Sequence, residues 1–153
     1  MIERERRERI AKERGTETTK RLDNPCETKI TSLYNVMVSL RQRTKRFAVD
    51  VFELIDQIPQ TPKGVVVQTQ LAKAASSAAA NYRAAQRARS RAEFISKLSI
   101  SLEEIDESSF WLEFLPDTRL IPFEGVDRLL QEADELAAIV VASRRTARKN
   151  GKK

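Results

Sequence analysis

Apolar side chains recur every three or four residues in four segments of this chain, which is the spacing of one face of an amphipathic helix. Charged residues alternate with this stripe in residues 39–58, where the apolar positions are Phe47, Val51, Leu54, Ile55 and Ile58. Similar patterns run through residues 62–88, 90–117 and 126–141. The pattern therefore predicts four helices.

Two short motifs indicate where the second and third helices begin. Thr61 precedes Pro62, and this pair suits the N-cap and the first position of a helix, where the missing proline amide costs nothing. Ser90 and Glu93 match a capping box. In that motif the serine hydroxyl accepts from the amide of residue 93, and the glutamate reaches back to the amide of residue 90. We expect helices to start at these two points.

The second and third helices differ in the side chains that they place inside. The second is rich in alanine, the best helix former, and small residues let a neighbouring helix approach closely. The third has a stripe of larger side chains that we predict to be buried: Phe94, Ile95, Leu98, Leu102, Ile105, Phe110, Trp111 and Leu112. Trp111 and Phe114 are expected to be core residues, with the Trp111 indole N–H at an interface. An aromatic platform for base stacking is the alternative.

Similar helix lengths and short connections predict an all-α fold, an up-down-up-down antiparallel four-helix bundle. An exchange of the hairpin of helices two and three with a neighbouring chain is the alternative arrangement. We divide the chain into a charged N-terminal extension at residues 1–38, disordered or helical, the bundle at residues 39–143, and a basic C-terminal tail at residues 144–153.

The composition of the 153 residues excludes several other classes of fold and function. Four glycines and five prolines supply too few turns for a many-stranded sandwich or barrel. The chain has no histidine and one cysteine, Cys26, which excludes catalytic triads, most zinc sites, internal disulfides and CxxC motifs. It contains neither a run of about 18 apolar residues nor a signal-peptide pattern. We predict a cytoplasmic protein without membrane contact.

An acidic cluster on the third helix is the strongest candidate for metal chemistry; it contains Glu103, Glu104, Asp106, Glu107 and Glu113. Bundles that hold two metal ions in carboxylates also use histidines, which this chain lacks. We interpret the cluster as side chains that pair with bases or face solvent, and we expect neither a metal nor a cofactor. A structural role in hydrogen bonds is the alternative for Glu104 and Glu107.

Three polar residues, Ser76, Ser77 and Asn81, lie inside the alanine-rich second helix, where helix propensity does not favour them. Antiparallel pairing would bring Asn81 near Lys97 or Leu98, and Ser77 near Ser101 or Leu102. We therefore predict hydrogen bonds between the two helices at these positions. Neither serine has a candidate base, so we do not expect a nucleophile.

The positive charge is concentrated in two short segments. The predicted turn between helices two and three carries +4 from Arg83, Arg87, Arg89 and Arg91. The last ten residues carry +6 from Arg144, Arg145, Arg148, Lys149, Lys152 and Lys153, which leaves −4 for the rest of a chain whose net charge is +6. This asymmetry is typical of a protein that contacts phosphate backbones. A solvated tail and cations that stabilise a helix C-terminus are the structural alternatives.

Several motifs between residues 40 and 142 occur together in one known family. They are Gln70-Leu71, Ala75-Ser76-Ser77, Ala79-Ala80-Asn81-Tyr82-Arg83-Ala84, the stretch 87–98, and Glu103-Glu104 followed by Glu107, Trp111 and Leu112. With these residues the chain resembles the bacterial four-helix bundle proteins known as the 23S rRNA-intervening-sequence protein family. The resemblance implies a bundle that assembles as a homopentamer, and it brings no catalytic residues.

A branch related to that family serves as the accessory protein of diversity-generating retroelements, in which a basic pentamer binds nucleic acid and a reverse transcriptase. We therefore expect a non-enzymatic homo-oligomer that binds RNA or other nucleic acid through the ten basic residues named above. The alternative is a protein-interaction scaffold whose partner is a protein such as a reverse transcriptase.

Overall fold

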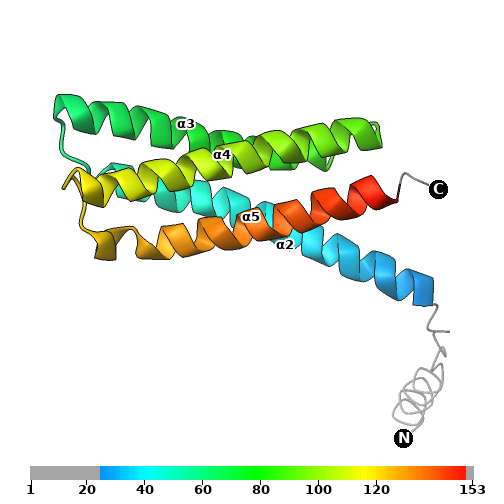
Figure 1. The fold of residues 1–153 in the computed structure, drawn as a ribbon. Coiled ribbons are helices and arrows are strands. Elements are labelled where there is room, and N and C mark those ends of the chain that lie inside the picture. Colours follow the sequence, from blue (N-terminus) through cyan, green and yellow to red (C-terminus); the bar gives the residue numbers. More distant parts are fainter. Residues whose placement is uncertain (1–24, 151–153) are drawn as a thin grey trace, which may run out of the picture. The chain divides into compact units, whose positions relative to one another are not determined.

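The computed structural model describes residues 25–150, with side chains from residue 39 onward. Its elements are α2 (Pro25–Ile55), α3 (Pro62–Ala85), α4 (Arg91–Asp117), the short 3-10 helix η1 (Phe123–Gly125) and α5 (Asp127–Lys149) (Figure 1). The described part of the chain contains four long helices and no strand, which confirms the predicted all-α bundle. The bundle belongs to a compact unit that begins at Asn35, within α2.

Both predicted helix caps are present. The Thr61 hydroxyl accepts from the amide of Gly64 at 3.2 Å, and Pro62 is the first residue of α3. The Ser90 hydroxyl accepts from the amide of Glu93 at 3.1 Å. One detail of the capping box was wrong, because the Glu93 carboxylate accepts from the amide of Arg89, at 2.8 Å, instead of that of Ser90.

A buried seam with alternating spacings of three and four residues follows each helix, as in coiled-coil packing. In α2 and the turn that follows it, the seam is Leu40, Thr44, Phe47, Val51, Leu54 and Ile58, all nearly inaccessible to solvent. In α4 it is Leu98, Ser101, Ile105, Ser108, Leu112 and Leu115. The two serines therefore occupy core positions between leucine and isoleucine layers.

Small side chains let α3 and α4 approach closely at these serines. Ala74, Ala75 and Ala78 of α3 are almost completely buried, and the Ser101 hydroxyl donates to the carbonyl of Ala78 at 2.8 Å. The expectation for the α3 residue Asn81 was wrong: its side chain donates to the carbonyl of Ser77, within α3, at 3.0 Å.

The hydroxyl of Ser76 also forms its hydrogen bond within α3. Ser76 is exposed and donates to the carbonyl of Lys73 at 3.1 Å, so it makes no contact with α4 through that bond. The hydrogen bond between α3 and α4 therefore comes from Ser101, on the partner helix, because its Cβ points into the seam while Ser76 points to solvent.

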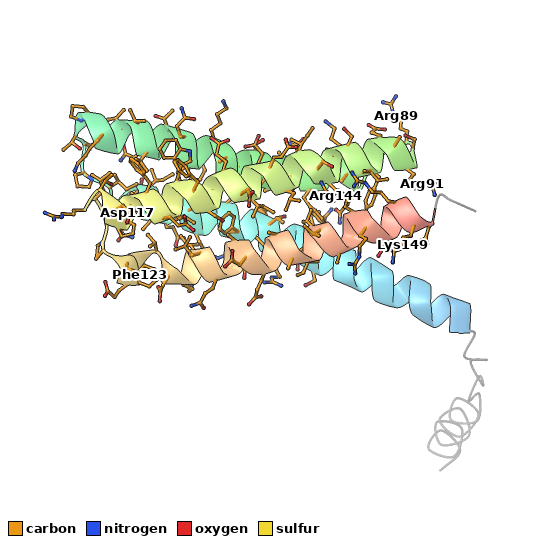
Figure 2. The ribbon with its side chains drawn as sticks, in the orientation of Figure 1. Arg89, Arg91, Asp117, Phe123, Arg144 and Lys149 are labelled. Carbon is orange, nitrogen blue, oxygen red and sulfur yellow. The ribbon has the colours of Figure 1, made fainter. Side chains whose placement is uncertain are left out.

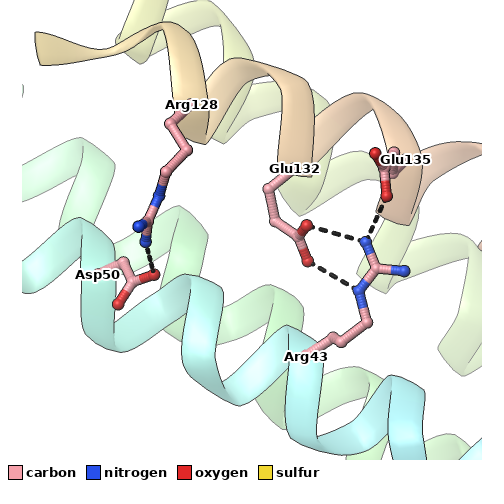
Figure 3. Close-up of polar contacts among 5 residues, drawn as sticks. All are labelled: Arg43, Asp50, Arg128, Glu132 and Glu135. Carbon is pink, nitrogen blue, oxygen red and sulfur yellow. Dashed lines mark hydrogen bonds and ion pairs between the residues drawn. The ribbon is translucent and has the colours of Figure 1, made fainter.

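Ion pairs connect α2 to α5 (Figure 3). The Arg43 guanidinium donates to both carboxylate oxygens of Glu132, at 3.0 and 2.8 Å, and to Glu135 at 2.6 Å. These hydrogen bonds, first to Glu132 and then to Glu135, raise the pKa of Arg43 above its ordinary value. Two helical turns along α2, Asp50 pairs with Arg128 at 2.6 Å. The order of these pairs shows that α2 and α5 are antiparallel.

The helix ends differ from the predicted segment boundaries. The first helix was predicted from residue 39, but α2 begins at Pro25, a residue suited to a first helical turn, and no glycine or proline interrupts residues 26–58. α5 continues past residue 144 to Lys149. The first 24 and last 3 residues of the extension and tail lie outside the described residues, and the functional division of the chain stays a prediction.

None of the helices in residues 25–150 combines the length and the apolar character needed to cross a membrane.

Candidate nucleic-acid interface

Both basic segments lie at the same end of the bundle. The turn between α3 and α4 carries Arg89 and Arg91, and the last turns of α5 carry Arg144 and Lys149 (Figure 2). These four side chains are at the end opposite Asp117, which marks the end of α4. The arrangement follows from the antiparallel topology, because the start of α4 and the end of α5 must be neighbours.

Seven basic side chains at this end are exposed, and within residues 39–150 none of them forms an ion pair. They are Arg83, Arg87, Arg89, Arg91, Arg145, Arg148 and Lys149, which we call the basic end. Acidic residues are scarce around them. Residues 83–97 contain five basic residues and one acid, Glu93, and residues 136–150 contain no acid. Seven uncompensated cations therefore face solvent together.

The opposite end of the bundle is acidic. Residues 113–135, which include the end of α4 and the start of α5, contain seven acidic and two basic residues. The bundle is therefore polarised along its axis, and an anion approaching from solution is attracted to the basic end.

Arg144 differs from the other predicted site residues. It is half-buried, and its guanidinium donates to the hydroxyl of Ser99 at 3.2 Å, which connects α5 to α4. Its charge contributes to the field of the basic end, but its side chain has a structural contact. The predicted site residues Lys152 and Lys153 lie outside the described residues.

A pocket of about 370 Å³ opens at the basic end, between the end of α3, the start of α4 and the end of α5. Its lining includes Arg91, Phe94, Ala147 and Gln86. The Gln86 side chain forms a hydrogen bond with Tyr82. Burial raises the pKa of Tyr82 above its ordinary value, and the hydrogen bond with Gln86 offsets part of this increase. No pattern in the sequence indicated this pocket, because its walls come from three separate helices.

The acidic cluster predicted on α4 does not form a metal site. In residues 39–150, no three Cys, Asp or Glu side chains converge in a group that could hold a metal ion. One of its members instead contacts an aromatic ring, since the Glu107 carboxylate accepts from the Trp111 indole at 3.3 Å.

Comparison with known proteins shows which family the chain belongs to. A family model described as 23S rRNA-intervening sequence protein matches residues 38–142. The chain belongs to this family. The resemblance stated from the sequence motifs is thereby confirmed, and the family is not a known enzyme family.

A solved structure supports the assignment to the 23S rRNA-intervening sequence protein family. It is a crystal structure of a protein with unknown function from the S23 ribosomal protein family of Bacteroides thetaiotaomicron VPI-5482, and it shares 30% sequence identity with this chain. The TM-score is 0.65, and the alignment covers 69% of this chain and 97% of the other. No curated protein matches the chain.

The family match divides the basic end into two parts. The arginines at the α3–α4 turn lie within residues 38–142, whereas Arg144 and the basic residues after it lie beyond the match. The turn therefore belongs to the portion of the bundle that the 23S rRNA-intervening sequence protein model describes, and the end of α5 adds positive charge next to it.

An exposed aromatic cluster on α4 is a surface feature that the sequence pattern missed. The rings of Phe110 and Trp111 are 5.0 Å apart, and that of Phe114 lies 6.0 Å from Phe110 and 5.6 Å from Trp111. The prediction that Phe110 is buried was wrong, since 53% of it is exposed. Trp111 and Phe114 are partly buried and pack against the core.

Proposed function

We propose that this protein binds nucleic acid through its basic end, with RNA as the natural ligand. The proposal is carried by one observation: two basic segments meet at one end of the bundle, although 53 residues separate Arg91 from Arg144 in the sequence. Few acidic residues offset this positive charge, since residues 136–150 contain none and residues 83–97 contain one. The family name refers to 23S rRNA, which makes fragments of that RNA the first ligands to test.

The proposed binding is electrostatic and independent of sequence. Each cation that contacts a phosphate releases a condensed counterion, so affinity falls linearly with salt on a logarithmic scale. Seven exposed cations within one end are enough to contact several successive phosphates. Exposed guanidinium groups also suit phosphate geometrically, because they donate two parallel hydrogen bonds.

We expect a fluorescent 20-nucleotide RNA to bind the full-length protein at 50 mM salt and to lose affinity steeply as salt rises. With about four phosphate contacts to a single strand, the slope of log K against log salt is about −3. Fluorescence anisotropy at a series of salt concentrations measures it. An absence of binding at 50 mM salt, or an affinity independent of salt, would contradict the proposal.

We also propose that the protein associates with further copies of itself through the exposed aromatic cluster on α4. Phe110 projects from the bundle with about half its surface in water, and the partly buried rings of Trp111 and Phe114 lie beside it. Burying such rings is favourable, and aromatic residues are enriched in protein interfaces. An oligomer would repeat the basic end several times, and multivalency raises the affinity for a long RNA without new contacts.

Light scattering after size-exclusion chromatography tests this self-association. We expect a mass that is a multiple of the 17.5 kDa chain mass, and a shift toward the monomer for Phe110→Ser. Phe123→Ser is the matched control, because Phe123 is 57% exposed but lies in η1 and is not part of the α4 cluster. A monomeric wild-type protein, or an equal effect of both substitutions, would contradict the assignment of the interface.

A further inference from the structure

The pocket at the basic end has a lining unlike that of the surrounding charged surface. Small apolar side chains, Ala85, Ala88 and Ala147, form part of its wall, and Phe94 contributes an aromatic ring that also packs against the core. The polar groups that line it include Arg91 and Asn150. The site thus combines an apolar wall, one aromatic ring and a few groups able to form hydrogen bonds.

The size of the pocket suits a small planar group. Ligand sites in proteins commonly have volumes of about 300–1,000 Å³, and this pocket, at about 370 Å³, lies near the lower limit. It is largely open to solvent, so one part of a larger ligand can enter while the remainder stays outside.

The charges around the pocket indicate what that larger ligand is. Arg89, Arg91 and Lys149 are exposed at the same end of the bundle and form no ion pair within the described residues. Arg148 is the residue directly after Ala147 of the pocket wall. A ligand that combines a flat, largely apolar ring with adjacent negative charge matches both features. An unpaired nucleotide is such a ligand.

We propose that this pocket binds the base of an unpaired nucleotide in a single-stranded nucleic acid, an inference that rests on the proposed function. The base contacts Phe94 and the alanines, as bases do on aromatic side chains in other single-strand binders. Arg91 and Asn150 contact its polar edge, and the neighbouring cations contact the flanking phosphates. A base inside a duplex cannot enter, so the pocket selects single strands.

The test compares two ten-nucleotide oligomers on the full-length protein at 50 mM salt, oligothymidylate and an abasic oligomer with the same number of phosphates. We expect the abasic oligomer to bind about tenfold more weakly, which corresponds to the loss of one stacked base. Ala147→Leu fills the pocket without changing charge, and we expect it to bind oligothymidylate as weakly as wild type binds the abasic oligomer. Ala142→Leu, at an exposed position of the same helix, is the matched control and should bind like wild type.

The outcomes separate the two proposals. Equal binding of both oligomers by the wild-type protein overturns the pocket proposal and leaves phosphate binding intact. Discrimination that survives Ala147→Leu also overturns it, because the bases would then be recognised elsewhere. Binding of a ten-residue polyglutamate as tightly as oligothymidylate indicates an acidic peptide and overturns it as well. If neither oligomer binds, the proposed function and the pocket proposal both fail. Thermal unfolding of Ala147→Leu confirms that the variant is folded.

Discussion

Replacing Gly64 with alanine is expected to destabilise the bundle by about 3 kcal/mol, the upper part of the range for overpacked sites. Gly64 is buried in the first turn of α3, where an added Cβ would overlap the carbonyl oxygen of Pro59. That carbonyl is fixed, since it accepts from the amide of Thr61 at 2.8 Å. The backbone of the α2–α3 connection would have to move, and the Thr61 cap that depends on the Gly64 amide would be disturbed.

The direction of this effect makes it diagnostic. In an ordinary helix, glycine to alanine stabilises by about 1 kcal/mol, because alanine has the higher helix propensity. Urea unfolding followed by circular dichroism would show a lower midpoint for Gly64→Ala. Gly125→Ala is the matched control, because its added Cβ would meet only the Ile121 side chain, at 2.8 Å, which can adjust. A higher midpoint for Gly64→Ala would contradict the close approach of Pro59.

The helix starts were the part of the fold that the sequence determined best, because their signals are local. Thr61 with Pro62, and Ser90 with Glu93, each place the donor and acceptor groups of a cap within four residues. The start of the first helix was not predictable in this way. Pro25 lies 14 residues before the predicted start at residue 39, and the intervening residues contain no helix breaker.

The inner face of α4 was harder to predict, because two of its core positions are polar. Ser101 and Ser108 interrupt the apolar seam, so the apolar stripe was assigned to include Phe110, which points outward. The neighbouring helix α3 explains why serines, and not Phe110, occupy the inner face of α4. The small α3 residues Ala74 and Ala78 bring the backbones close together, and a serine fits there while a phenylalanine does not.

The sequence allowed us to predict which helix ends form the candidate site, but not how its side chains pack. An antiparallel bundle places the start of α4 beside the end of α5, so the convergence of the two basic segments follows from the element order. The contact of Arg144 with Ser99 and the pocket beside Ala147 depend on how side chains from different helices pack. Neither leaves a pattern within one segment of the sequence.

Replacing Arg87, Arg89 and Arg148 together with glutamine is expected to weaken RNA binding on the order of 100-fold at 50 mM salt, through the loss of about three phosphate contacts. All three side chains are exposed and form no ion pair within residues 39–150, so their loss should leave the fold unchanged. The salt slope of log K should become shallower by about 2, since fewer counterions are released. The three residues do not line the pocket, so the difference between normal and abasic oligomers should persist.

The matched control removes the same charge from other parts of the chain. Arg41, Lys45 and Lys73 are also exposed and unpaired within the described residues, but they lie on α2 and the middle of α3. Replacing these three with glutamine lowers the net charge by the same amount. We expect it to weaken RNA binding less than about tenfold, because long-range attraction between exposed charges is screened over about 10 Å at ordinary salt. Equal losses in the two triple variants would mean that net charge, and not the basic end, governs binding, whereas a selective loss places the phosphate contacts at the end of the bundle where α3, α4 and α5 meet.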